Sequence, residues 1–184
     1  MVDIDRRTAF VAGLAAASLI SNTSAFAQQA AAGSAESRMR ELGIELPKAL
    51  APVANYVPAA RSGNLIFLAG LPPVKPDGKF ATGKVWIDVT LDEAYQHARL
   101  VGIGLLAVMR HELGSLDKIV RIGRVFGMVN AAPNFTDHPK VINGCSDLFV
   151  EVFGDRGRRA RCAVGMASLP FNISVEIEAV VEVT

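Results

Sequence analysis

The chain has 184 residues, of which 51% are hydrophobic and 20% are charged, and its formal net charge is +1. This length is enough for one hydrophobic core and too short for two full domains. The near balance of charge gives no indication of a nucleic-acid or membrane surface. Cys145 and Cys162 are too few for a disulfide framework or a zinc site of their own.

Residues 1–27 have the three-part order of a secretory signal peptide. Arg6 and Arg7 precede an apolar run from Ala9 to Ile20, and the small-x-small pattern Ala25-Phe26-Ala27 follows a polar stretch. The paired arginines favour the twin-arginine type. We therefore expect a periplasmic protein, with an uncleaved leader helix and a cytoplasmic location as the alternative. The sequence predicts no membrane-spanning segment in the mature form.

Residues 28–52 are expected to form a flexible spacer and one short helix. The stretch from 28 to 35 is rich in Ala, Gln, Gly and Ser, which is typical of a flexible linker. Glu36–Leu42 can form a helix that Gly43 ends. The main domain is then predicted to cover residues 53–184.

The first half of this domain is predicted to contain a hairpin and a long helix. Tyr56–Arg61 and Leu65–Ala69 flank the turn signal Ser62-Gly63-Asn64. Thr90-Leu91-Asp92-Glu93 is a capping box that starts a helix, and Gly114 ends this helix. Gly102 and Gly104 lower intrinsic helix stability, so we expect close packing at both.

The second half alternates strands and one helix. The pattern predicts a strand over Lys118–Val129, a helix over Pro139–Phe153, and strands over Arg159–Ala167 and Ser174–Val183. This order indicates an α+β domain with one mixed sheet and two helices packed on one face. The other face keeps apolar residues, and a homo-oligomer is the simplest source of cover for it.

Several familiar sites are absent from the sequence. It has no Gly-rich phosphate loop and no G-x-S-x-G motif. His97, His111 and His138 do not lie at metal-ligand spacing, so no metal site is predicted. An exposed or capping role is the favoured interpretation for His97 and His111. Cys145 lies on the apolar stripe of a helix, which favours core packing over a nucleophile.

The run Arg156-Gly157-Arg158-Arg159-Ala160-Arg161 is the densest positive charge in the chain. No aromatic residues interleave with it to stack on bases, so most of it is interpreted as a solvated loop. Arg161 differs because it lies inside a predicted strand, where a buried charge needs an anionic partner. That partner is either Glu176 or Glu178 on a neighbouring strand, or the carboxylate of a ligand held bidentately. Glu176 is either an outward-facing strand residue or a group that positions water or carries a proton.

Five segments form a pattern in a fixed order. Ala160–Gly165, then Leu169-Pro170, then Val175–Glu178 read A-R-x-x-V … L-P … [VI]-E-[IV]-E, and Gly63–Gly70 and Gly114–Val120 precede them. From Val53 to Val183 the chain resembles the RidA/YjgF family of reactive-intermediate deaminases, also labelled L-PSP endoribonucleases. The resemblance implies a chorismate-mutase-like fold, a homotrimer, and ligand clefts between subunits.

The resemblance also implies hydrolysis of enamine and imine acids, such as 2-iminopropanoate and 2-iminobutanoate, to 2-keto acids and ammonia. No cofactor and no nucleic-acid partner are implied. By this resemblance Arg161 binds the substrate carboxylate and Glu176 positions the attacking water. The backbone at Ala163 meets the imine nitrogen. The remaining residues that line the implied cleft are Tyr56, Ala69, Gly70 and Asn143.

Two positions depart from the family pattern. Ala69 stands where the family has a serine, and Ala163 stands where it has a cysteine. A backbone contact survives such a change, whereas a hydroxyl contact does not. These departures motivate a second hypothesis, a trimer that binds small carboxylates without catalysis. An endoribonuclease is the third and least favoured, because the sequence offers neither a stacking surface nor a histidine pair.

Overall fold

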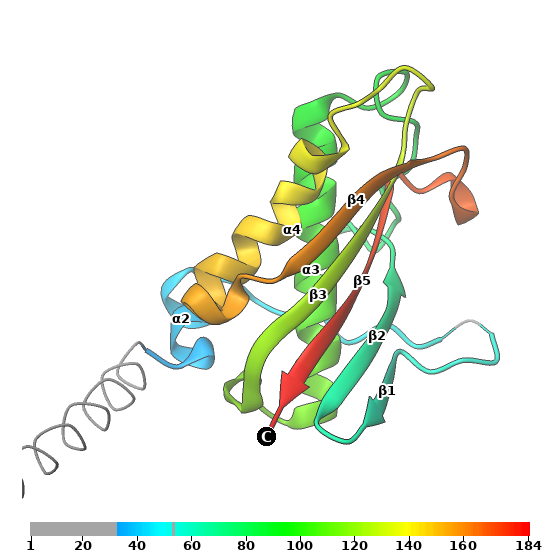
Figure 1. Cartoon of the computed structure of the whole chain (residues 1–184). Coiled ribbons are helices and arrows are strands. Elements are labelled where there is room, and N and C mark those ends of the chain that lie inside the picture. Colours follow the sequence, from blue (N-terminus) through cyan, green and yellow to red (C-terminus); the bar gives the residue numbers. More distant parts are fainter. Residues whose placement is uncertain (1–32, 53) are drawn as a thin grey trace, which may run out of the picture. The chain divides into compact units, whose positions relative to one another are not determined.

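A mixed five-stranded sheet with helices on one face forms the body of the protein (Figure 1). The structure is a computed structural model that describes residues 33–52 and 54–184. The strands lie in the order β1-β2-β5-β3-β4, and only the β3–β4 pair is parallel. Their bounds are Ala59–Ser62 for β1, Leu65–Leu71 for β2, Ile119–Asn130 for β3, Ala160–Met166 for β4 and Val175–Val183 for β5.

Two long helices cover one face of this sheet, as predicted. Helix α3 spans Leu91–Leu113 and begins with the expected capping box, in which Thr90 and Glu93 bond each other's backbone N–H groups. Gly114 ends it in the left-handed conformation at φ 76°. Helix α4 spans His138–Phe153. The predicted element order is therefore confirmed. Within the described ranges no helix is both long and apolar enough to cross a membrane.

The two faces of the sheet differ in burial. On β5 the alternate residues Val175, Ile177 and Ala179 are buried against the helices, whereas Glu176 and Glu178 between them are half-buried on the other face. On β2 the exposed residues Leu65 and Phe67 lie on that second face. No helix of the described chain covers the second face (Figure 1).

Helices α3 and α4 cross where their glycines allow close approach. A side chain at Gly144 would collide with the carbonyl oxygen of Tyr95 on α3. A Cβ at Gly102 would lie 2.8 Å from Leu148 Cδ2, so the predicted close packing there is confirmed. The same prediction was wrong for Gly104, because the nearest atom to a Cβ there is Leu71 Cδ1 at an ordinary 3.5 Å.

We expect Gly144→Ala and Gly104→Ala to change stability in opposite directions. The Gly144 methyl group must displace helix backbone, which should cost about 2–3 kcal/mol of unfolding free energy. The Gly104 methyl group meets no close atom and removes a helix-destabilising glycine, which should gain up to about 1 kcal/mol. Urea unfolding of the two variants measures both values. Equal effects would contradict the proposed helix crossing.

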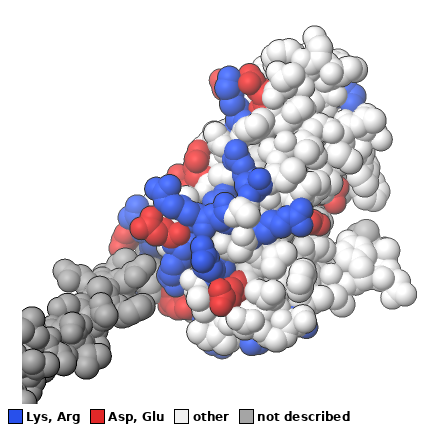
Figure 2. Space-filling model, viewed as in Figure 1, with Lys and Arg blue, Asp and Glu red and all other residues white. Residues whose placement is uncertain are grey.

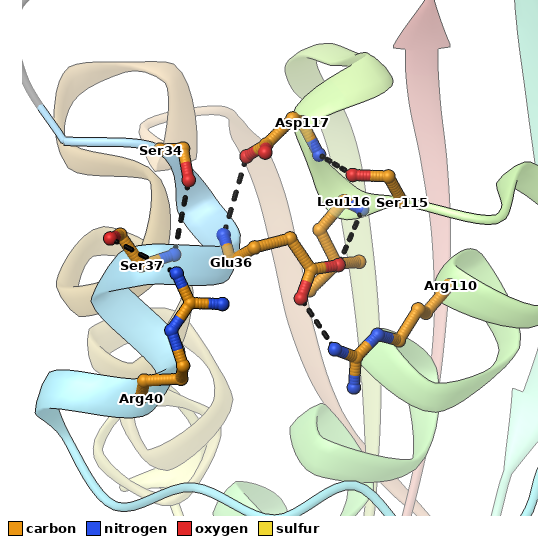
Figure 3. Close-up of polar contacts among 8 residues, drawn as sticks. All are labelled: Ser34, Glu36, Ser37, Arg40, Arg110, Ser115, Leu116 and Asp117. Atoms are coloured by element: carbon orange, nitrogen blue, oxygen red, sulfur yellow. Dashed lines mark hydrogen bonds and ion pairs between the residues drawn. The ribbon is translucent and has the colours of Figure 1, made fainter.

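A third helix, α2 at Ala35–Glu41, is fixed to the end of α3 (Figure 3). The Glu36 carboxylate accepts hydrogen bonds from Arg110 Nη2 at 2.6 Å and from the Leu116 backbone N–H at 3.0 Å. The Glu36 backbone N–H donates to Asp117 at 3.3 Å. Helix α2 belongs to the compact unit Ser34–Thr184. The predicted signal peptide, residues 1–27, lies outside the described residues.

Candidate functional site

Arg161 lies on β4, at the edge of the sheet, with its side chain on the helix side. Its Nη1 donates to Asn143 Oδ1 at 2.7 Å and to Ser146 Oγ at 3.0 Å, both on α4. The Nε and Nη2 groups have no hydrogen-bond partner within residues 33–52 and 54–184. One edge of the exposed guanidinium is thus fixed, and the other edge can receive a carboxylate bidentately.

Of the two alternatives for the partner of Arg161, the salt bridge to Glu176 or Glu178 is wrong. Strand β3 lies between β4 and β5, so the two carboxylates are not on a strand adjacent to Arg161. Three of the predicted site residues, Arg161, Asn143 and Ala163, do come together on the helix side of β4. Asn143 contacts Arg161, and Ala163 also faces the helix layer. As an edge strand, β4 also presents backbone groups without a sheet partner near Ala163.

The other four predicted residues line a cavity of about 580 Å³ at the opposite edge region of the sheet. Glu176 reaches it from β5, Ala69 and Gly70 from β2, and Tyr56 from the loop before β1. Tyr56 was expected in the first strand, but β1 begins only at Ala59. The remaining lining residues are all apolar: Leu50, Ala51, Pro52, Pro58, Leu71, Pro72, Phe80, Pro170, Phe171 and Ile173.

Gly70 leaves room for the Glu176 carboxyl group. A Cβ at Gly70 would collide with Glu176 Oε1, and the β2–β5 register shifts between Leu68 and Leu71 to bring the two together. Half-burial, and then the nearby Glu178 carboxylate, raise the pKa of Glu176. A carboxyl group with a raised pKa in a largely apolar cavity is suited to proton transfer.

One chain does not bring Arg161 and Glu176 together. Arg161 contacts α4 and therefore lies on the helix side, whereas Glu176 lies on the uncovered side of the sheet. The seven predicted residues thus form two groups. We call Arg161, Asn143 and Ala163 the arginine half-site, and Tyr56, Ala69, Gly70 and Glu176 the glutamate half-site.

Charge differs between the regions of the two half-sites (Figure 2). Lys and Arg side chains gather where β4 begins, near the arginine half-site, while the side of β1 and β2 is mostly uncharged. Arg161 has no salt bridge among the residues that the structure describes. An anionic group is therefore attracted to the first region and an apolar group to the second.

Comparison with known proteins identifies the family. The family model described as "YjgF/chorismate mutase-like, putative endoribonuclease" matches residues 36–182. This chain belongs to the RidA/YjgF family. Its mixed sheet with helices on one face is the chorismate-mutase-like fold of that family, as predicted.

Three relatives of this RidA/YjgF chain each match more than four-fifths of its length. Protein TCP17 of Trypanosoma cruzi is 40% identical over 153 residues, which are 83% of this chain and 96% of the relative. The structure of a protein of unknown function from Agrobacterium tumefaciens is 46% identical with a TM-score of 0.74, and covers 82% of this chain and 94% of its own. A structure from Shewanella oneidensis described as a putative endoribonuclease is 31% identical with a TM-score of 0.79, and covers 82% and 100%.

Two of the three arginines that precede Arg161 in this RidA/YjgF domain are less exposed to solvent than the sequence predicted. Arg158 is exposed, as predicted, and pairs with Asp155 at 3.0 Å. Arg159 instead packs over the Phe149 ring and donates to two backbone carbonyls, and burial lowers its pKa. Arg156 is half-buried and donates to the Ile119 carbonyl at 2.8 Å. The solvated-loop interpretation is therefore wrong for Arg156 and Arg159.

Among the described residues, no histidine or cysteine lines the cavity beside Glu176 or hydrogen-bonds the Arg161 side chain. His97 is half-buried and bonds Ser174 Oγ at 2.9 Å, so its predicted exposed or capping role is wrong. His111 is exposed, as predicted. Cys145 is fully buried, which raises the pKa of its thiol to about 12, so core packing is confirmed for it. No cluster suited to a metal ion occurs among the described residues.

Asn130 was not predicted as a functional residue. It ends β3, is only 1% exposed, and accepts a 2.6 Å hydrogen bond from Lys84 Nζ. Its Nδ2 donates to Asn172 Oδ1 at 3.1 Å and to the Ile173 carbonyl at 3.2 Å. Asn130 therefore fixes the loop that runs along the cavity toward Glu176. A polar residue directly after an apolar strand is a weak signal, and its partners are too distant in sequence to be predicted.

Proposed function

We propose that the protein hydrolyses enamine and imine acids to 2-keto acids and ammonia, at sites composed of two half-sites from two copies of the chain. The observation that carries this proposal is the separation of Arg161 and Glu176 on opposite sides of one sheet. Each half-site holds part of the chemistry, and the uncovered sheet face with Leu65 and Phe67 offers a surface for association. A homotrimer with three equal clefts satisfies this requirement.

In this proposal Arg161 binds the substrate carboxylate. The bonds to Asn143 and Ser146 hold the guanidinium in place before substrate arrives, so little side-chain entropy is lost on binding. An unpaired backbone group at Ala163 would contact the imine nitrogen. The carboxylate and the nitrogen are thereby fixed relative to the group that attacks.

Glu176 then positions the attacking water. As the water oxygen bonds to the imine carbon, a proton passes to the Glu176 carboxylate and the C=N bond becomes C–N. The imine enters protonated, as C=NH2+, so return of the proton from Glu176 converts its nitrogen to –NH3+. The C–N bond then breaks as ammonia leaves, and the hydroxyl proton passes to that ammonia to give ammonium and the keto group. One water is consumed and Glu176 ends in its starting state. The raised pKa of Glu176 makes its carboxylate a stronger base than an ordinary glutamate, which favours uptake of the proton from water.

A direct assay tests the proposal. An amino-acid oxidase generates 2-iminopropanoate from alanine, and semicarbazide traps the imine that remains at set times. We expect the protein to accelerate imine loss and to release ammonia in equal amount. An unchanged decay rate would contradict the deaminase proposal. Tight binding of pyruvate by calorimetry without any acceleration would instead support a non-catalytic carboxylate-binding protein, which Ala69 and Ala163 favour.

The family description also suggests a ribonuclease. The positive region at the start of β4 is the feature that favours it (Figure 2). His97 and His138 have separate surroundings, since His97 bonds Ser174 and His138 packs on Phe135. A histidine pair for RNA cleavage is therefore not assembled within the described chain. Incubation with labelled RNA distinguishes the two activities, and cleavage would support the ribonuclease.

We expect Glu178→Gln to extend activity to lower pH. Glu176 must be ionised to accept a proton, so the rate falls as pH drops through its pKa. The Glu178 charge contributes to the raised pKa of Glu176, and its removal should move the acidic limb of the kcat/KM profile to lower pH. Glu182→Gln is the matched control, because Glu182 lies on the same face of β5 but bonds Asn64. An unshifted limb in Glu178→Gln would show that Glu176 does not set it.

A further inference from the structure

The loop between β4 and β5 holds an aromatic ring at the cavity in an unfavourable backbone conformation. Phe171 and Asn172 both have φ of 54°, a region that residues with side chains rarely adopt. Phe171 is nevertheless 71% exposed, although it is a large apolar side chain. A backbone conformation of this kind persists only where the surrounding structure enforces it, and such positions cluster at functional sites.

The surrounding hydrogen bonds enforce this conformation. The Asn172 side chain and the Ile173 carbonyl accept from buried Asn130, and the Asn172 carbonyl accepts from the Gly83 N–H at 2.8 Å. The loop also closes on itself, since the Asn172 N–H donates to the Leu169 carbonyl at 3.2 Å. Burial of the Phe171 ring does not explain its position, because the ring is exposed. Contact with a ligand in the cavity does explain it.

The cavity next to Glu176 has rigid and flat walls. Three aromatic side chains line it, those of Tyr56, Phe80 and Phe171, together with the four prolines 52, 58, 72 and 170. The Phe80 and Phe171 rings pack at a centroid distance of 6.0 Å and an angle of 55°. Aromatic and proline surfaces favour a planar ring, which can pack edge-to-face or offset on them. A side chain as small as a methyl group would leave most of this apolar surface without contacts.

From these features we infer that the substrate carries an aromatic side chain, which packs against Phe171 and Phe80 in the cavity beside Glu176. This inference rests on the proposed function and names its substrate class as arylalanine-derived imino acids. Phe171 is then a specificity-determining residue. Asn130 is a positioning residue, since it acts only through the loop that carries Phe171. Each additional apolar group in a hydrophobic pocket discriminates by about 10-fold or more in kcat/KM.

The test compares imines generated from phenylalanine and from alanine by the same oxidase. We expect the wild-type protein to favour the phenylalanine-derived imine by about 10-fold or more in kcat/KM. Phe171→Gly should bring this ratio close to one by slowing only the aromatic substrate. The same variant should raise the urea midpoint, because glycine adopts the positive φ without strain. Ile87→Ala removes another exposed apolar side chain, outside the cavity, and should leave the ratio unchanged.

The outcomes separate this inference from the proposed function. A ratio near one in the wild-type protein, or a ratio unchanged by Phe171→Gly, would overturn the aromatic preference while the deaminase proposal stands. If neither imine is hydrolysed, the proposed function fails, and calorimetry with phenylpyruvate and pyruvate decides the preference alone. A Phe171→Gly protein that sediments as a smaller oligomer than the wild type would identify Phe171 as an interface residue and also overturn the inference.

Discussion

Arg161→Ala is expected to lower kcat/KM for imine hydrolysis by at least about 100-fold, because hydrogen bonds to charged groups contribute about 1.5–3 kcal/mol and this side chain offers two. The loss should appear in substrate binding and in the rate, since the carboxylate also orients the imine carbon toward water. The fold should persist. Arg161 is exposed, and its partners Asn143 and Ser146 are only half-buried, so they can bond water after the change.

Arg158→Ala is the matched control for this prediction. It removes one positive charge from the same run of arginines, but Arg158 points to Asp155 and takes no part in the arginine half-site. A general electrostatic attraction of anions would make both variants equally slow, and that slowing would decrease at high salt. If Arg161 instead makes a specific contact with the substrate carboxylate, the kcat/KM of Arg158→Ala stays close to that of the wild type. Equal loss in the two variants would contradict the role proposed for Arg161.

The secondary structure could be predicted because its signals are local. The Thr90–Glu93 capping box, the glycines after α3 and α4, and the strict alternation of Val175–Val183 each act over a few residues. Of the seven site residues, Arg161 and Glu176 were singled out by their charge and strand position, and family resemblance added the other five. Four of these seven line one cavity, and two of the other three are joined by a hydrogen bond.

The relation between the two half-sites could not be predicted, because it depends on strand order and on side-chain direction. Placing β3 between β4 and β5 separates Arg161 from Glu176, and nothing in either strand encodes that order locally. Long-range contacts were missed for the same reason. His97 bonds Ser174 across 77 residues, and Arg156 bonds Ile119 across 37. Sequence spacing gives no information about such partners.

Mixing two inactive variants is expected to restore activity. In Arg161→Ala every arginine half-site is damaged, and in Glu176→Gln every glutamate half-site is damaged. If each site combines half-sites from two copies, a randomly mixed oligomer contains sites with both halves intact, in about a quarter of all positions. Co-expression of the two variants should therefore give about a quarter of wild-type activity, far above either variant alone.

This complementation separates a shared site from a site within one chain. Two half-sites in one chain could be joined on one face only if a single strand, β4 or β5, turned over, and in β5 this would expose Val175 and Ile177 and bury Glu176 in the core. Such a rearrangement predicts no complementation, because every chain in the mixture carries one damaged half. The double variant with both changes in the same chain, co-expressed with wild type, is the control. Activity of the variant mixture that stays at the level of the single variants would contradict the composite site.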